Sequence, residues 1–258
     1  MGHVIACANQ KGGVGKTTTV VNLATYLALE GKRVLVVDLD PQGNATSGLG
    51  FDRNSGVGSI YPALVDGSSA STLIRATQIE GLWLIPSGRD LAGAEVELVG
   101  LTQRERKLQV ALADLRAQFD FVLLDCPPAV GLLTVNALTA ADGVLVPIQC
   151  EYYALEGLSQ LLSTVDLVRD NLNPRLSLTG ILLTMYDART TLSADVAAEV
   201  RRHLDGQVFR TIVPRSVRLA EAPSYGRPIA RYSPESRGAQ AYRELAGEIL
   251  ERSQVVTA

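Results

Sequence analysis

A glycine-rich segment near the start of the chain, residues 9–18 (NQKGGVGKTT), constrains the fold more than any other feature. An apolar run at residues 4–8 precedes it, and a helical pattern begins at Lys16. A strand, a glycine-rich loop and a helix in this order form a phosphate-binding loop when the loop ends in Gly-Lys-Ser/Thr. That ending is present as Gly15, Lys16 and Thr17, so the sequence predicts a nucleotide-binding α/β protein.

The loop departs from the common pattern, G-x-x-x-x-G-K-[ST], at two positions. The first glycine of the pattern would fall on Gln10, and a second lysine, Lys11, follows it. One lysine suffices to bind a triphosphate, and Lys16 already occupies that position. The additional lysine therefore needs a role of its own.

Short apolar runs rich in β-branched residues alternate with helical stretches along the chain. The runs are residues 4–8, 33–38, 82–86, 121–125, 143–148, 178–184 and 208–212; the helical stretches are 16–30, 103–118, 155–171, 193–204 and 237–252. Runs that are apolar at nearly every position are typical of strands covered on both faces. With no repeat or long linker, we expect residues 1–258 to form a single-domain P-loop NTPase, with a mostly parallel twisted sheet and helices on both faces. Residues 43–58, rich in Gly, Ser and Asn, read as a mobile loop.

Cysteine usage and apolar run length exclude several classes of protein. Cys7, Cys126 and Cys150 are odd in number at unrelated spacings, which favours buried small side chains over disulfides. His3 and His203 are isolated and match no metal site. No apolar run approaches the roughly 20 residues that span a bilayer, and no secretory signal is visible. We expect a cytoplasmic protein.

The glycines of the loop let successive backbone N–H groups turn toward phosphate oxygens, and the start of the following helix adds positive charge. Lys16 would reach the β- and γ-phosphates of ATP, and the Thr17 hydroxyl would ligate Mg²⁺. The expected nucleotide contacts in this loop are Lys11, Gly12, Gly13, Val14, Gly15, Lys16, Thr17 and Thr18.

Three aspartates follow apolar runs. Asp125 ends the run at 121–125, where it would hold Mg²⁺ through a water, because Mg²⁺ gives up its waters reluctantly. Asp38 and Asp40 close another run, and Pro41 ends any strand there. We favour Asp40 as the residue that orients the attacking water and place Asp38 nearer the sheet, where capping or hydrogen bonding at the strand end is an equal alternative.

Four segments together resemble the ParA/Soj-type partition ATPases of the deviant Walker A group: KGGVGKTT, VDLDPQGNATSGLG, LDCPP and VPRSVRLAEAPSYGRPI. The similarity covers about residues 4–250, and the last segment is specific to the ParA branch. The resemblance implies that Lys11 is a signature lysine that reaches the partner subunit's nucleotide in an ATP-sandwich homodimer, so that Lys11, Lys16 and Asp40 are the catalytic residues. It also implies that Pro214 and Ser216 lie near the adenine, although the family often has Asn where Ser216 stands.

Basic residues concentrate between Arg201 and Arg231, where seven arginines accompany only Asp205 and Glu221 in a chain of net charge −3. Arginines that contact phosphates bind DNA without sequence preference, and a dimer strengthens a weak patch. A solvated arginine-rich surface explains the charge equally well. The resemblance adds the expectation that the ATP dimer binds double-stranded DNA through Arg189, Arg215 and Arg218.

The resemblance further implies a nucleoid-associated protein and a ParB-type centromere-binding partner that stimulates slow hydrolysis. A MinD-like membrane ATPase would need a C-terminal amphipathic anchor with a basic face, but the end of the chain, GEILERSQVVTA, carries Glu248 and Glu251. An iron–sulfur carrier would need more than Cys126 at the interface. A DNA-coating regulator with incidental hydrolysis is the remaining alternative, and the short segment before Val4 leaves no room for a helix-turn-helix domain.

Overall fold

The computed structural model describes residues 2–52, 58–151 and 154–256. One eight-stranded sheet runs through the molecule in the order β3-β4-β2-β5-β1-β6-β7-β8. The strands are β1 (His3–Cys7), β2 (Val34–Asp38), β3 (Arg75–Ala76), β4 (Leu82–Ile85), β5 (Phe121–Asp125), β6 (Gly143–Gln149), β7 (Ser177–Tyr186) and β8 (Val208–Pro214). All neighbouring strands pair in parallel except β3, which pairs antiparallel with β4 at the edge.

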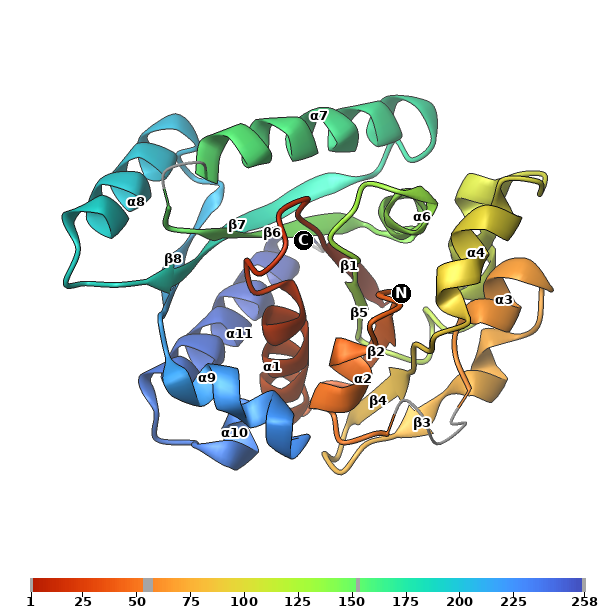
Figure 1. Ribbon diagram of the computed structural model, residues 1–258, viewed down its shortest axis with the longest axis horizontal. Helices are drawn as coiled ribbons and strands as arrows, with labels where there is room; N and C mark the ends of the chain where they lie inside the picture. The colour runs from red at the N-terminus through yellow and green to blue at the C-terminus, as the bar shows by residue number, and fades with distance from the viewer. Residues whose placement is uncertain (1, 53–57, 152–153, 257–258) are drawn as a thin grey trace.

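Helices cover both faces of this sheet, as Figure 1 shows. The α-helices are α1 (Lys16–Leu29), α2 (Asn44–Gly48), α3 (Tyr61–Val65), α4 (Leu91–Leu98), α5 (Lys107–Ala111), α6 (Leu132–Ala140), α7 (Ala154–Asn171), α8 (Thr191–His203), α9 (Val217–Glu221), α10 (Ile229–Tyr232) and α11 (Arg237–Val256). Single 3₁₀ turns occur at η1 (Ala70–Leu73), η2 (Arg104–Arg106) and η3 (Ala222–Tyr225). The predicted fold class, a mostly parallel sheet between two helical layers, is confirmed.

Two apolar cores lie on the two faces of the sheet. Along β1 the side chains alternate between them: Val4 and Ala6 pack with α3 to α8, whereas Ile5 and Cys7 pack with α1, α2 and α9 to α11. Successive strand residues point to opposite faces, so a strand buried on both sides is apolar throughout. Each apolar run predicted from the sequence forms one of the strands for this reason.

Two predicted segments differ in the structure. The helix expected over residues 103–118 is divided into η2, α5 and a series of turns, in which Leu115 N donates to Leu112 O three residues back. The loop expected over residues 43–58 contains the helix α2, while residues 53–57 lie outside the described part. In the second case the cause is a distant contact, because the Asp38 carboxylate accepts the Thr46 backbone N–H inside the first turn of α2.

The helices on the face of the sheet that carries Ile5 and Cys7 are joined by buried polar contacts. The Thr19 and Tyr242 hydroxyls lie 3.2 Å apart between α1 and α11, and Asn22 Oδ1 accepts the backbone N–H of Ile229 at 2.7 Å. Glu248 on α11 accepts from the backbone N–H groups of both Arg210 and Thr211, which fixes β8 against α11. Among the described residues, none of the helices is apolar over enough of its length to cross a membrane.

Candidate nucleotide site

The glycine-rich loop leaves β1 in the middle of the sheet and enters α1. Gly13 and Gly15 adopt positive φ angles of 74° and 93°, the left-handed region that disfavours residues with a side chain. A β-carbon on Gly15 would meet only the Thr184 side chain, at 3.8 Å. Backbone conformation, rather than lack of space, therefore requires glycine at position 15.

Two side chains that the sequence did not point out hold this loop in shape. Asn9 donates from Nδ2 to Pro147 O at 2.7 Å and accepts the Lys11 backbone N–H at 3.0 Å. Thr184, on β7, donates its hydroxyl to Val14 O at 2.8 Å. These contacts come from residues up to 170 positions away in sequence, so no local pattern signals them.

The two lysines of the loop have opposite environments. The Lys16 side chain is buried, and its Nζ donates to Lys11 O at 3.2 Å, on the inside of the loop where phosphates bind. Lys11 is 43% exposed, and its Nζ lies 3.1 Å from Glu151 Oε2. Lys16 therefore points to the inside of the loop, while Lys11 lies at the surface against Glu151.

Two buried carboxylates stand side by side at the ends of β2 and β5, where Asp38 is the register partner of Asp125. Burial raises the pKa of Asp125 well above its usual range, and the neighbouring Asp38 raises this pKa further. Burial also raises the pKa of Asp38 to about 6, although hydrogen bonds from Thr46 and Asp40 oppose the shift. A cation placed here would offset the repulsion.

Asp125 fits the role predicted for it at a magnesium ion. Both of its carboxylate oxygens are buried and have no hydrogen-bond partner in the described part of the chain. The Thr17 side chain opposes the rise in the pKa of Asp125. Hard oxygen donors of this kind, a hydroxyl and a carboxylate, are those that Mg²⁺ uses. No cluster of three or more His, Cys, Asp or Glu side chains suited to a metal occurs among the described residues, here or elsewhere.

Asp38 and Asp40 accept different hydrogen bonds. The Asp38 oxygens are occupied by the backbone N–H and hydroxyl of Thr46 and by the backbone N–H of Asp40. Asp40 lies beyond the end of β2, as expected from Pro41, and uses Oδ1 to accept the Gln42 backbone N–H at 2.9 Å. The hydrogen-bonding alternative for Asp38 is thus what the structure shows.

Ser87 fixes the backbone that carries Asp40. Its hydroxyl donates to Asp40 O at 2.6 Å, and its backbone N–H donates to the Thr46 hydroxyl at 3.0 Å. Ser87 follows β4, the next strand along the sheet, and no sequence pattern indicated this role. It is a positioning residue for the loop after β2.

A cavity of about 270 Å³ lies beside the phosphate loop. Gly15 and Thr18 line it from the loop, and Pro214 and Ser216 line it from the end of β8. The predicted adenine residues are therefore brought next to the predicted phosphate site. Since ligand pockets usually measure about 300–1,000 Å³, this cavity is the size of part of a nucleotide. The Ser216 hydroxyl also accepts the Leu219 backbone N–H and caps α9, a role that serine and asparagine can both fill.

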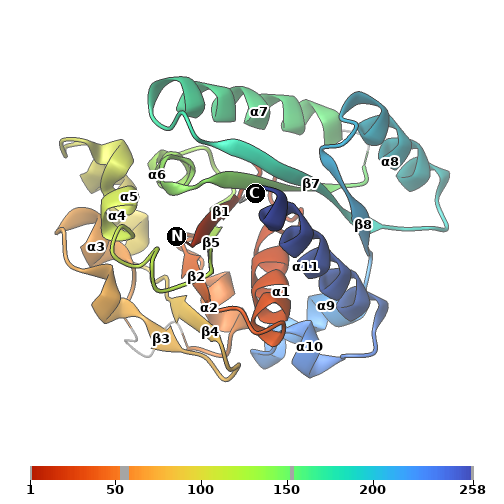
Figure 2. The ribbon, with the colours of Figure 1, turned by 180° about the vertical axis from the view of Figure 1, so that it is seen from behind.

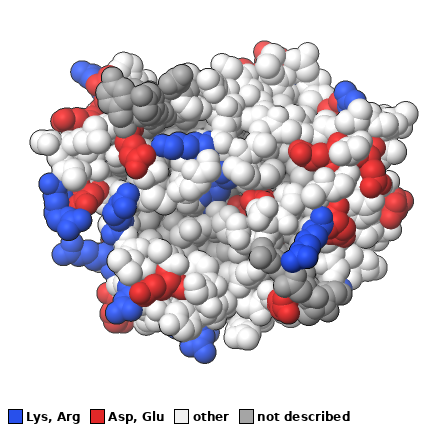
Figure 3. All heavy atoms as spheres, viewed as in Figure 1, with Lys and Arg blue, Asp and Glu red and all other residues white. Residues whose placement is uncertain are grey.

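The predicted DNA-binding arginines gather at the ends of β7 and β8 and on α9. Figure 3 shows Lys and Arg side chains collected on this side of the face that Figure 1 presents. Arg189 forms an ion pair with Asp187 at 2.7 Å, and the charge of Arg215 also lowers the pKa of Asp187. Arg218 pairs with Glu221 at 3.1 Å. We call Arg189, Arg215 and Arg218 the basic face.

The other arginines of the basic segment are dispersed. Arg210 pairs with Glu251 at 2.6 Å and lies 3.6 Å from buried Glu248, and Arg202 pairs with Glu199 on α8. The positive charge counted along residues 201–231 is therefore partly neutralised by carboxylates from other segments. The sequence count overstates the charge of any single surface.

Comparison with known proteins places this geometry in a family. A family model described as an AAA domain matches residues 2–178. The sporulation initiation inhibitor protein Soj of Bacillus subtilis is 55% identical over 96% of this chain and 98% of its own length. The chromosome-partitioning ATPase Soj of Thermus thermophilus is 56% identical over 97% of this chain and 96% of its own length.

Solved structures share the fold over the whole chain. A Mycobacterium smegmatis structure named cobyrinic acid a,c-diamide synthase, with bound ADP and magnesium, superimposes with a TM-score of 0.87 at 42% identity and covers 98% of this chain and 96% of its own. The cell division ATPase MinD of Pyrococcus furiosus reaches a TM-score of 0.79 at 26% identity, covering 97% of this chain and 99% of its own.

The buried Lys16, the exposed Lys11 and the paired carboxylates of β2 and β5 lie at the end of the sheet where the phosphate loop begins. The family matches indicate an ATP-hydrolysing P-loop protein, and ADP with magnesium occupies the related Mycobacterium smegmatis structure. With more than half of its residues identical to two Soj proteins across almost its full length, the chain belongs to the ParA/Soj family of ATPases.

Proposed function

We propose that this ATPase segregates DNA by using ATP to control when two subunits hold it. ATP closes two subunits face to face, the dimer binds double-stranded DNA without sequence preference, and hydrolysis stimulated by a ParB-type partner releases it. Partition is the function named for two relatives that are 56% and 52% identical, and the whole chain, residues 1–258, acts as one ATPase domain.

The observation that carries this proposal is the turn between β8 and α9. Pro214, Arg215 and Ser216 line the cavity beside the phosphate loop, and Arg215 also belongs to the basic face, together with Arg218 on the adjoining helix α9. A nucleotide seated in the cavity contacts the segment that carries two of the DNA-binding arginines. On this proposal the nucleotide state and DNA binding are coupled through the few residues of this segment.

Lys11 supplies the link between subunits. Its ammonium group lies outside its own phosphate site, and among the described residues its ion-pair partner is Glu151; both side chains are more than 40% exposed. Exposed pairs are worth only about 0–1 kcal/mol, so this contact is easily exchanged for a partner's phosphate. A cation that arrives only when two subunits meet acts as a trans-acting arginine finger does.

Within each subunit, Lys16 neutralises the phosphates, Thr17 ligates Mg²⁺ and Asp125 holds it through a water. Asp40, on the backbone that Ser87 fixes, orients the attacking water. Phosphoryl transfer depends on positioning and charge neutralisation more than on a strong base, so a carboxylate suffices there. Mg²⁺ would supply charge neutralisation at the β- and γ-phosphates.

DNA binding by one subunit is weak on this proposal. Arg189, Arg215 and Arg218 face Asp187 and Glu221, which leaves a small positive excess. Two such faces on one dimer raise the effective concentration of cations at the DNA, so binding depends on ATP. The same property places the ATP-bound protein on the nucleoid.

A membrane function is not favoured. At the end of the chain, Glu248 is buried against β8 and the apolar face of α11 packs on α1 and the sheet, so this face is not available to a bilayer. The synthase activity in the name of the Mycobacterium smegmatis structure is likewise not transferred, because relatives of higher identity carry chromosome-partitioning names.

The decisive experiment measures binding to a DNA duplex with ATP, with ADP and without nucleotide, across a salt series. We expect binding with ATP alone and a steep loss of affinity as salt rises. Equal binding in all three nucleotide states would overturn the switch, and ATP-dependent binding to anionic vesicles in place of DNA would favour the MinD function. Light scattering of Lys11→Ala tests the dimer separately: we expect ATP to bind while the protein stays monomeric.

A further inference from the structure

A second cavity, of about 620 Å³, lies at the opposite end of the strands from the nucleotide site. It is lined by Gly2 and His3 at the start of β1, by the first residues of β7, and by Arg252 near the end of α11. In Figure 2 the labels N and C mark the start of β1 and the end of α11, near which this cavity lies. The ATPase function proposed above uses none of these residues.

The charge around this cavity is unbalanced. Arg116, Arg175 and Arg252 line it, and the only carboxylate among its lining residues is that of Asp142. Burial lowers the pKa of His3 although Asp142 opposes this, so the imidazole is neutral at neutral pH. The cavity therefore has an excess of positive charge of about two.

Arg116 is tied to Asp142 and still has unused donors. Its Nη2 contacts both carboxylate oxygens, and the two side chains are only 18% and 23% exposed. Its Nε is buried and has no hydrogen-bond partner in the part of the chain that the structure describes. A buried donor left without a partner costs free energy that an oxygen ligand can recover.

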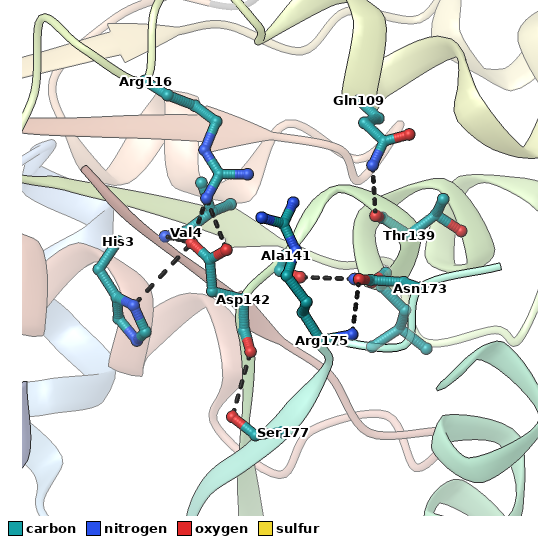
Figure 4. A network of polar contacts seen from close by, with 11 residues as sticks. His3, Val4, Gln109, Arg116, Thr139, Ala141, Asp142, Asn173, Arg175 and Ser177 are labelled. Atoms are coloured by element: carbon teal, nitrogen blue, oxygen red, sulfur yellow. Dashed lines mark hydrogen bonds and ion pairs between the residues drawn. The ribbon is translucent and has the colours of Figure 1, made fainter. Parts of the chain in front are cut away.

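Arg175 enters the cavity from the segment before β7. Figure 4 shows the guanidinium groups of Arg116 and Arg175 approaching the region of Asp142 from two different elements. Among the described residues no carboxylate lies within ion-pair distance of Arg175. Its guanidinium is exposed and available to a ligand.

Arg252 is held rigidly by uncharged groups. It donates to Thr179 O at 2.8 Å and to Val208 O at 3.4 Å, and its guanidinium lies 4.2 Å from the centre of the Phe209 ring. No carboxylate neutralises it in the described part of the chain. An arginine fixed this way loses little entropy when it binds a ligand.

We propose that this cavity binds a small phosphorylated anion, from pyrophosphate to a nucleotide in size. Guanidinium groups match phosphate oxygens through paired N–H donors, and two uncompensated charges match a ligand carrying two or more negative charges. The volume falls within the range of about 300–1,000 Å³ found for small-molecule sites. This inference is independent of the partition function, because it rests on residues at the other end of the sheet.

Pyrophosphate is the probe, added at constant ionic strength to protein whose phosphate loop is already saturated with a non-hydrolysable ATP analogue and Mg²⁺. Backbone amide NMR signals report the location of binding. We expect saturable shifts at Gly2, Ser177 and Thr179, with the loop signals unchanged. Shifts confined to the loop, or no saturation, would overturn the proposal.

Arg175→Ala tests the charge, since this exposed side chain makes no ion pair and its loss leaves the fold intact. We expect pyrophosphate affinity to fall about tenfold, whereas the matched control Arg237→Ala, an exposed arginine on α11 outside the cavity, leaves it unchanged. Equal affinities for the two variants would refute the site. A DNA duplex that shifts the same amides and displaces pyrophosphate would assign the cavity to DNA phosphates instead.

Discussion

The nucleotide edge of the sheet and the basic face differ in how their charges are held. At the nucleotide edge Lys16, Asp38, Asp40 and Asp125 are all at least 90% buried. On the basic face Arg189 is 85% exposed and Arg218 60% exposed, each paired with a nearby carboxylate. Buried charges act at short range in a low dielectric, whereas exposed ones act together and are screened by salt. Single substitutions should therefore have large effects at the first region and graded effects at the second.

Removal of the buried lysine should produce the largest effect. Lys16→Ala deletes the cation inside the loop, and we expect ATP affinity to fall at least about 100-fold, because each lost hydrogen bond to a charged group is worth about 1.5–3 kcal/mol. Titration calorimetry measures this, with Lys32→Ala as the control. A loss of less than fivefold would show that the backbone alone binds the phosphates.

Asp40→Ala should separate binding from hydrolysis. We expect the turnover of ATP to fall about 100-fold, within the range for loss of a proton-handling or water-orienting group, while ATP still binds and the dimer stays on DNA. Single-turnover hydrolysis measures the chemical step. The control is Asp114→Ala, which removes an exposed carboxylate in the turns that follow α5. Hydrolysis at the wild-type rate would make the assignment of Asp40 wrong.

Arg218→Glu should weaken DNA binding about tenfold at physiological salt, without loss of the ATP dimer. The plot of log affinity against log salt should become less steep by about two for a dimer, one for each lost phosphate contact. Fluorescence anisotropy over a salt series gives both quantities. Arg237→Glu changes the same charge elsewhere, and an equal loss of affinity in that variant would argue for general charge rather than the basic face.

The smallest effect concerns pH. Folding raises the pKa of Asp38 to about 6, so its protonated form contributes stability at low pH, and this is lost as pH rises through 6. We expect the melting temperature of the nucleotide-free protein to fall by a few degrees between pH 5 and pH 7 relative to Asp38→Asn. His3, whose pKa is lowered by burial, acts in the opposite direction in both proteins. If the melting temperature changed equally with pH in the wild type and in Asp38→Asn, Asp38 would not be the source of the change.

The sequence predicted the nucleotide edge well because its main residues are local. A loop between a strand and a helix sets Gly15, Lys16 and Thr17 in place, and parallel strands bring Asp38 and Asp125 to the same edge. Asn9, Thr184 and Ser87 were missed because each is defined by a partner far along the chain.

The errors in secondary structure have the same origin. In residues 103–118 the apolar spacing suits one continuous helix, but the turns that follow α5 place Leu112 and Leu115 in the same core as Leu108. The helix α2 depends on the Asp38 carboxylate, which the sequence alone cannot place next to Thr46. The positions of exposed arginines were equally hard to predict, since their neutralising partners, such as Glu248 for Arg210, lie in other segments.

The contact between Lys11 and Glu151 has a consequence for timing. The Lys11 ammonium group cannot lie against Glu151 of its own subunit and at the phosphates of a partner at the same time, so on the proposed mechanism these two positions are mutually exclusive. An exposed pair worth about 0–1 kcal/mol shifts that choice by at most a few-fold. The ion pair with Glu151 thus holds Lys11 only weakly before a dimer forms. On the proposed mechanism, any delay in dimer formation comes from the binding of ATP and from the encounter of two subunits.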